Sequence, residues 1–385
     1  MIKSERHIAF LLGAGFSVPA GMPTAKTLNE SLVAHIFNAI RNSFKEGEDL
    51  TIIEYVFEKV LIDSDECGCF NYELYFDCLE KERGKDLDIN RLVSFVERGM
   101  YGYFWKCSMN DDEEAKMRKN NITNIVKSIK EKCYQYSDAI EDVERKYQFW
   151  IADSLTEHTQ NSKTKSVNTS YKGFVDILAH YVGQGYIVDI YTLNHDLFLE
   201  SLLQQKKLKD KVSNGFGGKS KLIKKKAYTT FDKKFFNKQI RIYKLHGSIN
   251  MHELFYFNKK DKKYIQITDG YSCENAFLMD DNKGASIIPL FLTGKNTKTQ
   301  KYEKEPFFTM FNLMKDNLKI TEKLIVVGYS GNDEGINNIL FEKYSNWDNA
   351  FVVAPSAKYH LFVQQKQAHP LNQGVESLKI EQIIR

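Results

Sequence analysis

The sequence predicts an α/β fold, in which a Rossmann-like, doubly wound parallel sheet carries an inserted α-helical domain. Three observations support this. Short apolar runs alternate with helical patterns in the C-terminal half, several of these runs are apolar at every position, and the first run ends in a glycine turn. Strands that alternate with helices form parallel sheets, and strands that are apolar on both faces are covered by helices on both sides.

Composition places the chain among folded globular proteins and excludes several other classes. Its 385 residues predict two to three domains, and 42% hydrophobic and 27% charged residues are ordinary values. The net charge of +4 gives no whole-molecule attraction to nucleic acids or membranes. The six cysteines include no Cys-x-x-Cys pair, so we expect a reducing cytoplasm rather than a disulfide scaffold.

The first strand is expected over His7 to Leu12, followed by a glycine turn and a helix from near Thr24. The basic and apolar N-terminus imitates a signal peptide, but Gly13 and Gly15 end the apolar run after about six residues. No apolar stretch reaches the roughly 18 to 20 residues that span a membrane. We therefore expect no membrane partner.

The domain boundaries follow from a change of sequence pattern. Residues 1–40 are predicted to form the first part of the Rossmann-like domain, 41–170 a helical insertion, and 171–385 the remainder. Mixed charged and apolar helical periodicity is typical of the middle segment. The polar stretch from Thr159 to Ser170 is its expected exit.

Further strands are expected where apolar runs recur after residue 170. They are Ile187 to Tyr191, Arg241 to Leu245, Ile287 to Leu292, Leu324 to Val327 and Phe351 to Ala354. Three lysine-rich segments between them, 206–226, 258–263 and 294–304, are expected to be surface loops. Because lysine-rich loops are usually solvated, we do not expect direct nucleic-acid binding.

The glycine turn is the first candidate site. In Gly13–Ser17, a strand ends in Gly-x-Gly, and this spacing lets backbone N–H groups approach a pyrophosphate. The match is partial, because Val18 stands where the dinucleotide fingerprint has its third glycine, and the Gly-Lys-Ser/Thr of a Walker A motif is absent. A plain tight turn is the alternative interpretation.

Three more strands end in polar residues. Asn194 and Asp196 follow one strand, His246 and Gly247 follow the next, and Gly328–Asp333 follows a third. Ligands of open α/β sheets bind outside the carboxyl ends of strands, and a histidine there is a candidate general base near neutral pH. Each motif alone is equally explained by a turn cap or a surface histidine.

Taken together and in this order, the four motifs resemble the silent-information-regulator, or sirtuin, family. The resemblance covers roughly residues 1–30 and 171–355. It implies a Rossmann-like fold that binds NAD as a substrate. It also implies two catalytic residues, Asn194 to orient a water or the ribose and His246 beside the hydroxyls of the nicotinamide ribose.

The resemblance further assigns NAD-binding roles, with the glycine turn at the pyrophosphate and nearby ribose, and Phe16 at the nicotinamide side. The residues implied are Gly13, Ala14, Gly15, Phe16, Ser17, Thr24, Asp196, Gly328, Ser330 and Asp333.

Departures from the family's pattern indicate which branch is involved. Protein-deacylating sirtuins have two Cys-x-x-Cys pairs after the His-Gly motif, since four thiolates close a structural zinc site, but only Cys273 lies between His246 and Gly328 here. We therefore expect no metal. The segment Gly21 to Lys26 also lacks the arginine of deacylases. The insertion resembles that of bacterial sirtuin-like NAD hydrolases of antiphage defence.

The leading hypothesis is an NAD+ glycohydrolase that gives nicotinamide and ADP-ribose, or a cyclic relative, and depletes NAD in abortive infection. The alternatives are a protein deacylase or ADP-ribosyltransferase, and a regulatory module that binds NAD or ADP-ribose without turnover. An unregulated NAD hydrolase would harm its own cell, so we expect control by self-assembly or by a partner. A homo-oligomer is therefore expected, and the resemblance points to a HerA-type hexameric ATPase as the partner.

Overall fold

The computed structural model describes about two thirds of the chain. The described residues are 5–24, 27–28, 56, 59, 65–66, 69–70, 72–83, 85, 88, 91, 135–161, 169–204, 208–256, 259–267, 277–280, 283–286, 289–292 and 301–384. The chain divides into two compact units, one of residues 1–28 with 148–385 and the other of residues 29–147. The predicted helix after Thr24 lies mainly outside the described residues, as do residues 294–300 of the third predicted loop.

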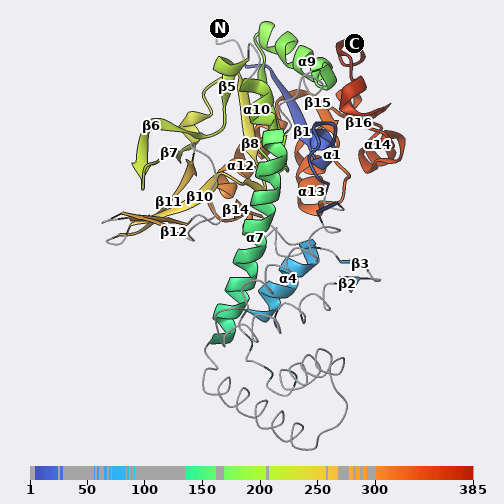
Figure 1. Ribbon diagram of the computed structural model, residues 1–385. Coiled ribbons are helices and arrows are strands. Elements are labelled where there is room, and N and C mark those ends of the chain that lie inside the picture. The colour runs from blue at the N-terminus through green and yellow to red at the C-terminus, as the bar shows by residue number, and fades with distance from the viewer. Residues whose placement is uncertain are drawn as a thin grey trace, which may run out of the picture. The chain divides into compact units, whose positions relative to one another are not determined.

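The larger unit is built on a parallel sheet of seven strands (Figure 1). In spatial order they are β17 (His369–Asn372), β16 (Ala350–Ala354), β15 (Thr321–Val327), β1 (His7–Leu12), β4 (Ile187–Thr192), β8 (Ile240–Lys244) and β5 (Val212–Ser213). Every neighbouring pair is parallel. The predicted α/β class with a parallel sheet is confirmed.

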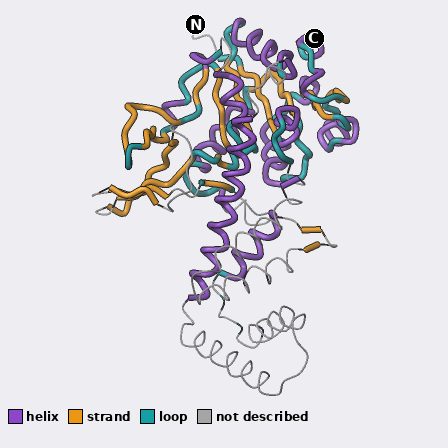
Figure 2. Tube along the Cα trace, in the orientation of Figure 1, coloured by secondary structure: helices purple, strands orange, loops and turns teal. Residues whose placement is uncertain are grey.

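Helices cover both faces of this sheet (Figure 2). The helices α9 (Lys172–Gly183) and α10 (Phe198–Gln204) pack on one face, and α12 (Phe307–Leu318), α13 (Glu334–Lys343) and α14 (Leu361–Lys366) pack on the other. Successive residues of β1 are buried in opposite cores, as the period of two in a strand requires. This explains why its sequence is apolar at nearly every position.

The chain order of the strands creates a switch point at β1. From β1 the chain continues to β4 on one side and later returns to β15 on the other. The register makes the carboxyl ends level, because Leu12 is paired with both Val327 and Thr192, and Thr192 is paired with Lys244. The turns that follow these strands therefore meet at one edge of the sheet, where α/β folds bind ligands.

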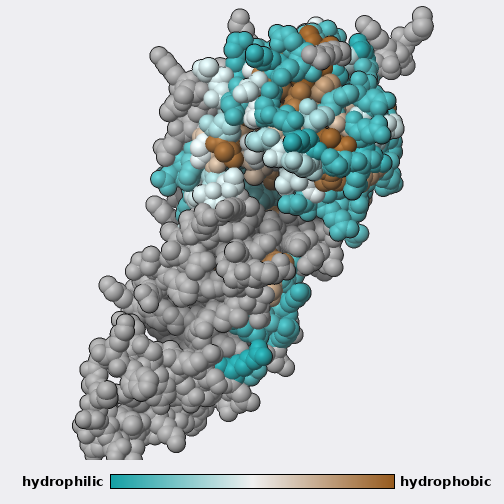
Figure 3. Space-filling view, turned by 90° about the vertical axis from the view of Figure 1, so that its right-hand side faces the viewer, coloured by the Kyte–Doolittle hydropathy of each residue, from teal (hydrophilic) through white to brown (hydrophobic). Residues whose placement is uncertain are grey.

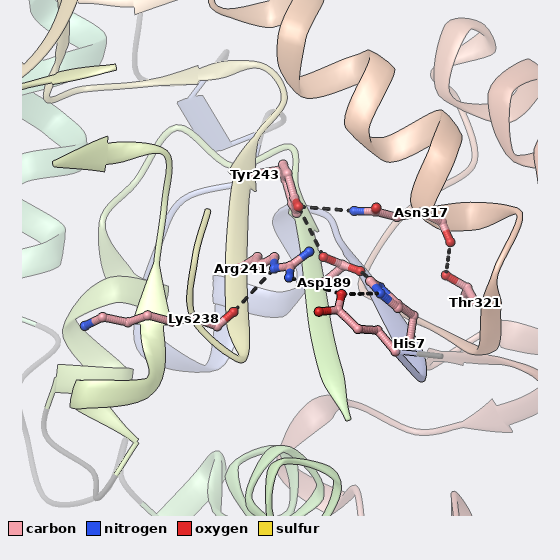
Figure 4. Close-up of polar contacts among 8 residues, drawn as sticks. His7, Asp189, Lys238, Arg241, Tyr243, Asn317 and Thr321 are labelled. Atoms are coloured by element: carbon pink, nitrogen blue, oxygen red, sulfur yellow. Dashed lines mark hydrogen bonds and ion pairs between the residues drawn. The ribbon is translucent and has the colours of Figure 1, made fainter. Parts of the chain in front are cut away.

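A buried polar cluster lies within the core on the α12 side of the sheet (Figure 4). The Asp189 carboxylate is fully buried; His7 Nδ1 lies 2.7 Å from one oxygen, and the Tyr243 hydroxyl donates to the other at 3.2 Å. Asn317 of α12 donates in turn to the Tyr243 hydroxyl at 3.1 Å. Burial, and after it the charge of Asp189, raises the pKa of Tyr243. The cluster connects three neighbouring strands with one covering helix.

The prediction of surface loops is wrong for two of the lysine-rich segments, 206–226 and 258–263. Residues 216–223 and 259–267 are strands of a second, antiparallel sheet, which contains β6 (Phe216–Ile223), β7 (Lys226–Phe231), β10 (Met251–Tyr256), β11 (Lys259–Ile267), β12 (Phe277–Asp280) and β13 (Lys283–Ser286). One face buries apolar side chains, among them Tyr228, Leu254 and Ile265. Lysines interrupt this alternation along the sequence and conceal it from a search for apolar runs.

The predicted strand Ile287 to Leu292 is also corrected. Within the described residues 289–292, the strand is β14 (Leu290–Phe291), and it pairs antiparallel with β9 (Gly247–Ser248) outside the parallel sheet. The apolar pattern of β14 does not decide which sheet it joins; its hydrogen bonds with β9 do.

The smaller unit is described only in parts. These are the hairpin β2 (Asp65–Glu66) and β3 (Cys69–Phe70), helix α4 (Tyr72–Glu82), and the beginning of α7 (Gln135–Asn161). The Tyr147 ring of α7 contacts the rings of Tyr75 and Phe76, with centroids 5.3 and 4.7 Å away. The predicted helical insertion at 41–170 stays a prediction, because many of its residues lie outside those described.

The surface of the larger unit is mostly polar where it can be seen. In the view of Figure 3, hydrophilic residues predominate and apolar residues form small, separate groups. No helix in the described part of the chain has the length and apolar character needed to cross a membrane.

We predict that the Asp189 cluster is a major source of stability. Asp189→Ala leaves His7 and Tyr243 without their shared partner, and we expect it to lower the free energy of unfolding by about 2 to 5 kcal/mol, since each buried polar group left unsatisfied costs about 1 to 3 kcal/mol. Urea unfolding followed by circular dichroism measures this. Asp316→Ala, which removes an exposed ion pair with Lys319, is the control and should change little. Equal effects of both substitutions would contradict the prediction.

Candidate functional site

The glycine turn after β1 is held directly against the turn after β15. Gly13 N donates to Val327 O at 3.1 Å, and Gly15 N donates to Gly328 O at 2.9 Å. A Cβ atom on Gly13 would lie 2.7 Å from Gly328 O, closer than real contacts allow. The short helical turn α1 (Ala14–Ser17) can therefore follow β1 only because glycine precedes it.

Gly328 meets the same constraint from the other side. Its φ of +61° lies in the left-handed region, and a Cβ there would lie 2.2 Å from Phe16 N. Its own N–H donates to Val353 O of β16 at 3.0 Å. Glycine is therefore required at this position for both conformation and space.

Asn194 ties the end of β4 to the glycine turn. Its Nδ2 group donates to Gly13 O and to Ser17 Oγ, both at 3.0 Å, and the residue is 9% exposed. Because a backbone carbonyl can only accept, this contact fixes the amide orientation. Both Nδ2 hydrogens are used, so Oδ1 is the acceptor that remains for a ligand or a water.

Asp196 and Lys244 brace the loop after β4. The Asp196 carboxylate accepts from Phe198 N at 2.9 Å at the start of α10, and the backbone carbonyl of Asp196 accepts from Lys244 Nζ. Lys244 is 2% exposed and also lies 3.3 Å from Glu200 Oε1. Sequence reasoning placed this lysine in the motif that ends in Ser248 but assigned it no role.

His246 lies beside Asp333. His246 is 5% exposed, and its Nε2 is 3.1 Å from Asp333 Oδ2. The other carboxylate oxygen of Asp333 accepts from Ile336 N at 3.1 Å and thereby caps α13. Gly247, with φ of +83°, lets the chain turn where a Cβ would lie 1.8 Å from Leu290 O. Asp333 therefore caps α13 with one carboxylate oxygen and lies beside His246 with the other.

Tyr329 organises the turn between Gly328 and α13, and the sequence did not single it out. Its hydroxyl donates to Asn337 Oδ1 at 2.8 Å and accepts from Asp333 N at 3.2 Å. Burial, followed by the charge of Asp333, raises the pKa of Tyr329, so the hydroxyl stays protonated as a donor. The only sequence signal was its position inside the Gly328–Asp333 motif.

The structure gives the remaining predicted site residues fewer contacts with the strand-end turns. Phe16 is 1% exposed, and its ring packs on Phe174 and Tyr171 in the core, with centroid distances of 4.8 and 5.2 Å. Ala14 and Ser330 are exposed at the turns. Thr24 Oγ1 accepts from Thr27 N at 3.2 Å, a local contact.

The structure thus brings the predicted residues together in two groups. One group joins the glycine turn, Asn194 and Gly328 through hydrogen bonds, and the other pairs His246 with Asp333. The His195 ring lies near the second group, 6.4 Å from the His246 ring. Among the described residues, three or more metal-binding side chains do not gather anywhere. At the described strand ends, the groups placed for chemistry include backbone groups, the Asn194 amide and the His246–Asp333 pair.

Comparison with known proteins gives one family match. Residues 188–377, just under half of the chain, match the family described as SIR2-like domain. This range includes Asn194, His246 and the Gly328–Asp333 turn, and leaves the first glycine turn outside. No curated protein matches.

Two solved structures are similar to the chain at 10% sequence identity. One is a mutant of Sir2 homologues in complex with 2'-O-acetyl ADP ribose, with a TM-score of 0.44, and the other is a mutant Sir2 homologue with ADP ribose, with a TM-score of 0.42. Each alignment covers 99% of this chain and 91% of the other.

We predict that Gly328→Ala damages the site through crowding, beyond its conformational strain. Gly185 is the matched control, because its φ is +84° and a Cβ there meets nothing within 4 Å. Gly185→Ala should cost about 1 to 2 kcal/mol of unfolding free energy, the strain alone. Gly328→Ala should cost clearly more, since a backbone nitrogen must move. Urea unfolding of the two variants makes the comparison, and equal losses would show that the turns are not tightly packed.

Proposed function

We propose that the chain is an NAD+ glycohydrolase that cleaves the nicotinamide–ribose bond to give nicotinamide and ADP-ribose or cyclic ADP-ribose. The observation that carries this proposal is the position of Asn194. It holds the glycine turn with both amide hydrogens and retains Oδ1 at the switch point of the sheet. The SIR2-like match over residues 188–377 and the order of the four motifs support it.

The reaction makes modest demands on acid catalysis. The bond between ribose C1′ and the nicotinamide nitrogen breaks, nicotinamide leaves as a neutral molecule, and an oxocarbenium-like carbon develops. For ADP-ribose, water adds to C1′ and loses a proton; for cyclic ADP-ribose, an adenine nitrogen of the same molecule adds to C1′ instead. The protein must orient the ribose, place the water and exclude other nucleophiles.

NAD binding is assigned to the two interlocked turns. Gly13, Gly15 and Gly328 carry no side chains, so the pyrophosphate can approach the backbone closely. Ala14 and Ser330 are exposed beside them, and the Ser330 hydroxyl is a donor for a phosphate or a ribose oxygen.

Asn194 and His246 are assigned the chemistry. Asn194 Oδ1 accepts a hydrogen bond from the attacking water or from a ribose hydroxyl. Asp333 Oδ2 lies 3.1 Å from His246 Nε2, so a proton on Nε2 faces the carboxylate and Nδ1 is assigned as the proton acceptor. Asp333 also stabilises the imidazolium that forms once the proton has been taken up.

The biological setting is proposed on the resemblance. We infer a cytoplasmic enzyme of antiphage defence that depletes NAD in abortive infection, acts as a homo-oligomer, and is controlled by a protein such as a HerA-type hexameric ATPase. The deacylase or ADP-ribosyltransferase alternative and the alternative of a binding module without turnover predict different products, so product analysis separates them.

We expect the purified chain to release nicotinamide from NAD, either alone or with the proposed HerA-type ATPase. His246→Ala should lower the rate of release by about 10²-fold to 10⁴-fold. Asn194→Ala should also abolish release while circular dichroism remains normal. His369→Ala, on the edge strand β17, is the control and should keep full activity. Binding of ADP-ribose by calorimetry without any release would replace this proposal with the binding module.

A second prediction separates the two roles of Asp333. Serine caps helices about as well as aspartate, so Asp333→Ser should retain α13 but lose the carboxylate beside His246. Nicotinamide release should fall about tenfold or more, as for a charged hydrogen bond of about 1.5 kcal/mol. Asp333→Ala should lose the same activity and in addition about 1 kcal/mol of stability. Full activity in Asp333→Ser would remove Asp333 from the mechanism.

A further inference from the structure

A cavity lies between α10, the short strand β5 and the start of β6, and none of the residues proposed for NAD binding or catalysis lines it. Its volume is about 390 Å³, within the range of ligand pockets. Apolar walls include Phe216, Phe235 and Ile242, and polar side chains line it as well. Nothing in the proposed NAD chemistry uses this cavity.

Lysines and an amide line the opening of the cavity. Lys209, Lys238 and Asn237 are exposed lining residues. Neither lysine forms an ion pair with the described residues. The cavity therefore combines apolar walls with a positively charged opening, which suits a planar aromatic group attached to a phosphate.

The segment around the cavity carries a concentrated positive charge. Residues 209–238 contain ten lysines and two aspartates, a net charge of +8, whereas the rest of the chain carries −4. The charge is therefore local, and the total of +4 conceals it. A separation of this kind creates a basic surface that attracts polyanions.

The hairpin of β6 and β7 carries part of this charge in a turn whose backbone conformation is strained. Its two turn residues, Lys224 and Lys225, have φ of +46° and +65°, a conformation that favours asparagine and glycine. Backbone strain of this kind clusters at functional sites. Lysines on β6 also protect an edge strand from pairing, but that protection does not require them in the strained turn.

We propose that the cavity binds one base of a single-stranded nucleic acid, whose phosphates are held by Lys209 and Lys238 and along the β6–β7 hairpin. The base of a single strand can leave its stack and enter a cavity, whereas a paired base cannot do so without unpairing. The sequence argued against nucleic-acid binding because the lysines were expected in solvated loops. In the structure, Lys219 and Lys221 lie on β6, whose first residues Phe216 and Gly217 line the cavity, and Lys209 lines the cavity itself.

Fluorescence anisotropy with the full chain tests the proposal without measuring NAD cleavage. The probes are a labelled thymidine oligonucleotide of about twelve nucleotides and an abasic strand of equal length. We expect the thymidine strand to bind more tightly by about fivefold to 150-fold, the contribution of one stacked base. Asn237→Trp, which places a large side chain at the opening, should abolish this preference and leave binding of the abasic strand unchanged.

The salt dependence of oligonucleotide binding tests whether Lys209 and Lys238 contact phosphates. Lys209→Ala with Lys238→Ala should reduce the slope of log affinity against log salt by about 1.4, since each phosphate contact on a single strand contributes about 0.7. The control is Lys358→Ala with Lys379→Ala, two exposed lysines outside residues 209–238 that remove the same charge. An unchanged slope in the first pair, or an equal change in both, would contradict the proposal.

Two further outcomes would overturn the proposal that the cavity binds a base. Equal affinity for the thymidine and abasic strands would exclude the cavity as a base site. Binding to phosphatidylserine vesicles but not to oligonucleotides would identify the basic surface as a membrane contact. The proposed NAD hydrolase could fail its own assay without affecting either result.

Discussion

The close approach of two strand-end turns is the constraint on which the candidate site depends. Neighbouring strands lie about 4.8 Å apart, so the turns that leave β1 and β15 at the switch point have no room for side chains between them. Gly13, Gly15 and Gly328 satisfy this limit, and backbone hydrogen bonds join the two turns. The arrangement that permits the sheet to reverse its order therefore also exposes backbone to a ligand.

The polar cluster in the core secures the alignment that the site needs. Slipping a strand by one residue would turn every side chain to the opposite face, and would move Asn194 relative to the glycine turn. Asp189 resists this, because its carboxylate is satisfied only when His7 of β1 and Tyr243 of β8 lie beside it. A buried charge thereby holds three strands in register, far along the sheet from the residues proposed for chemistry.

The sequence predicted the parallel strands and the four strand-end motifs because both are local patterns of apolarity and glycine. It could not place the Phe16 ring, which is buried because Phe174 and Tyr171 come from a distant segment. The pairing of His246 with Asp333 depends equally on folding, as the two residues follow different strands. The antiparallel sheet was missed for another reason, since lysines on β6 and β11 interrupt the apolar alternation that defines a strand.

Lys244 shows how the two candidate sites share one framework. Its ammonium group donates to the Asp196 carbonyl, in the loop that also carries Asn194, and lies 3.3 Å from Glu200, which lines the cavity beside β5. The loop after β4 and one wall of that cavity are therefore joined through a single buried side chain.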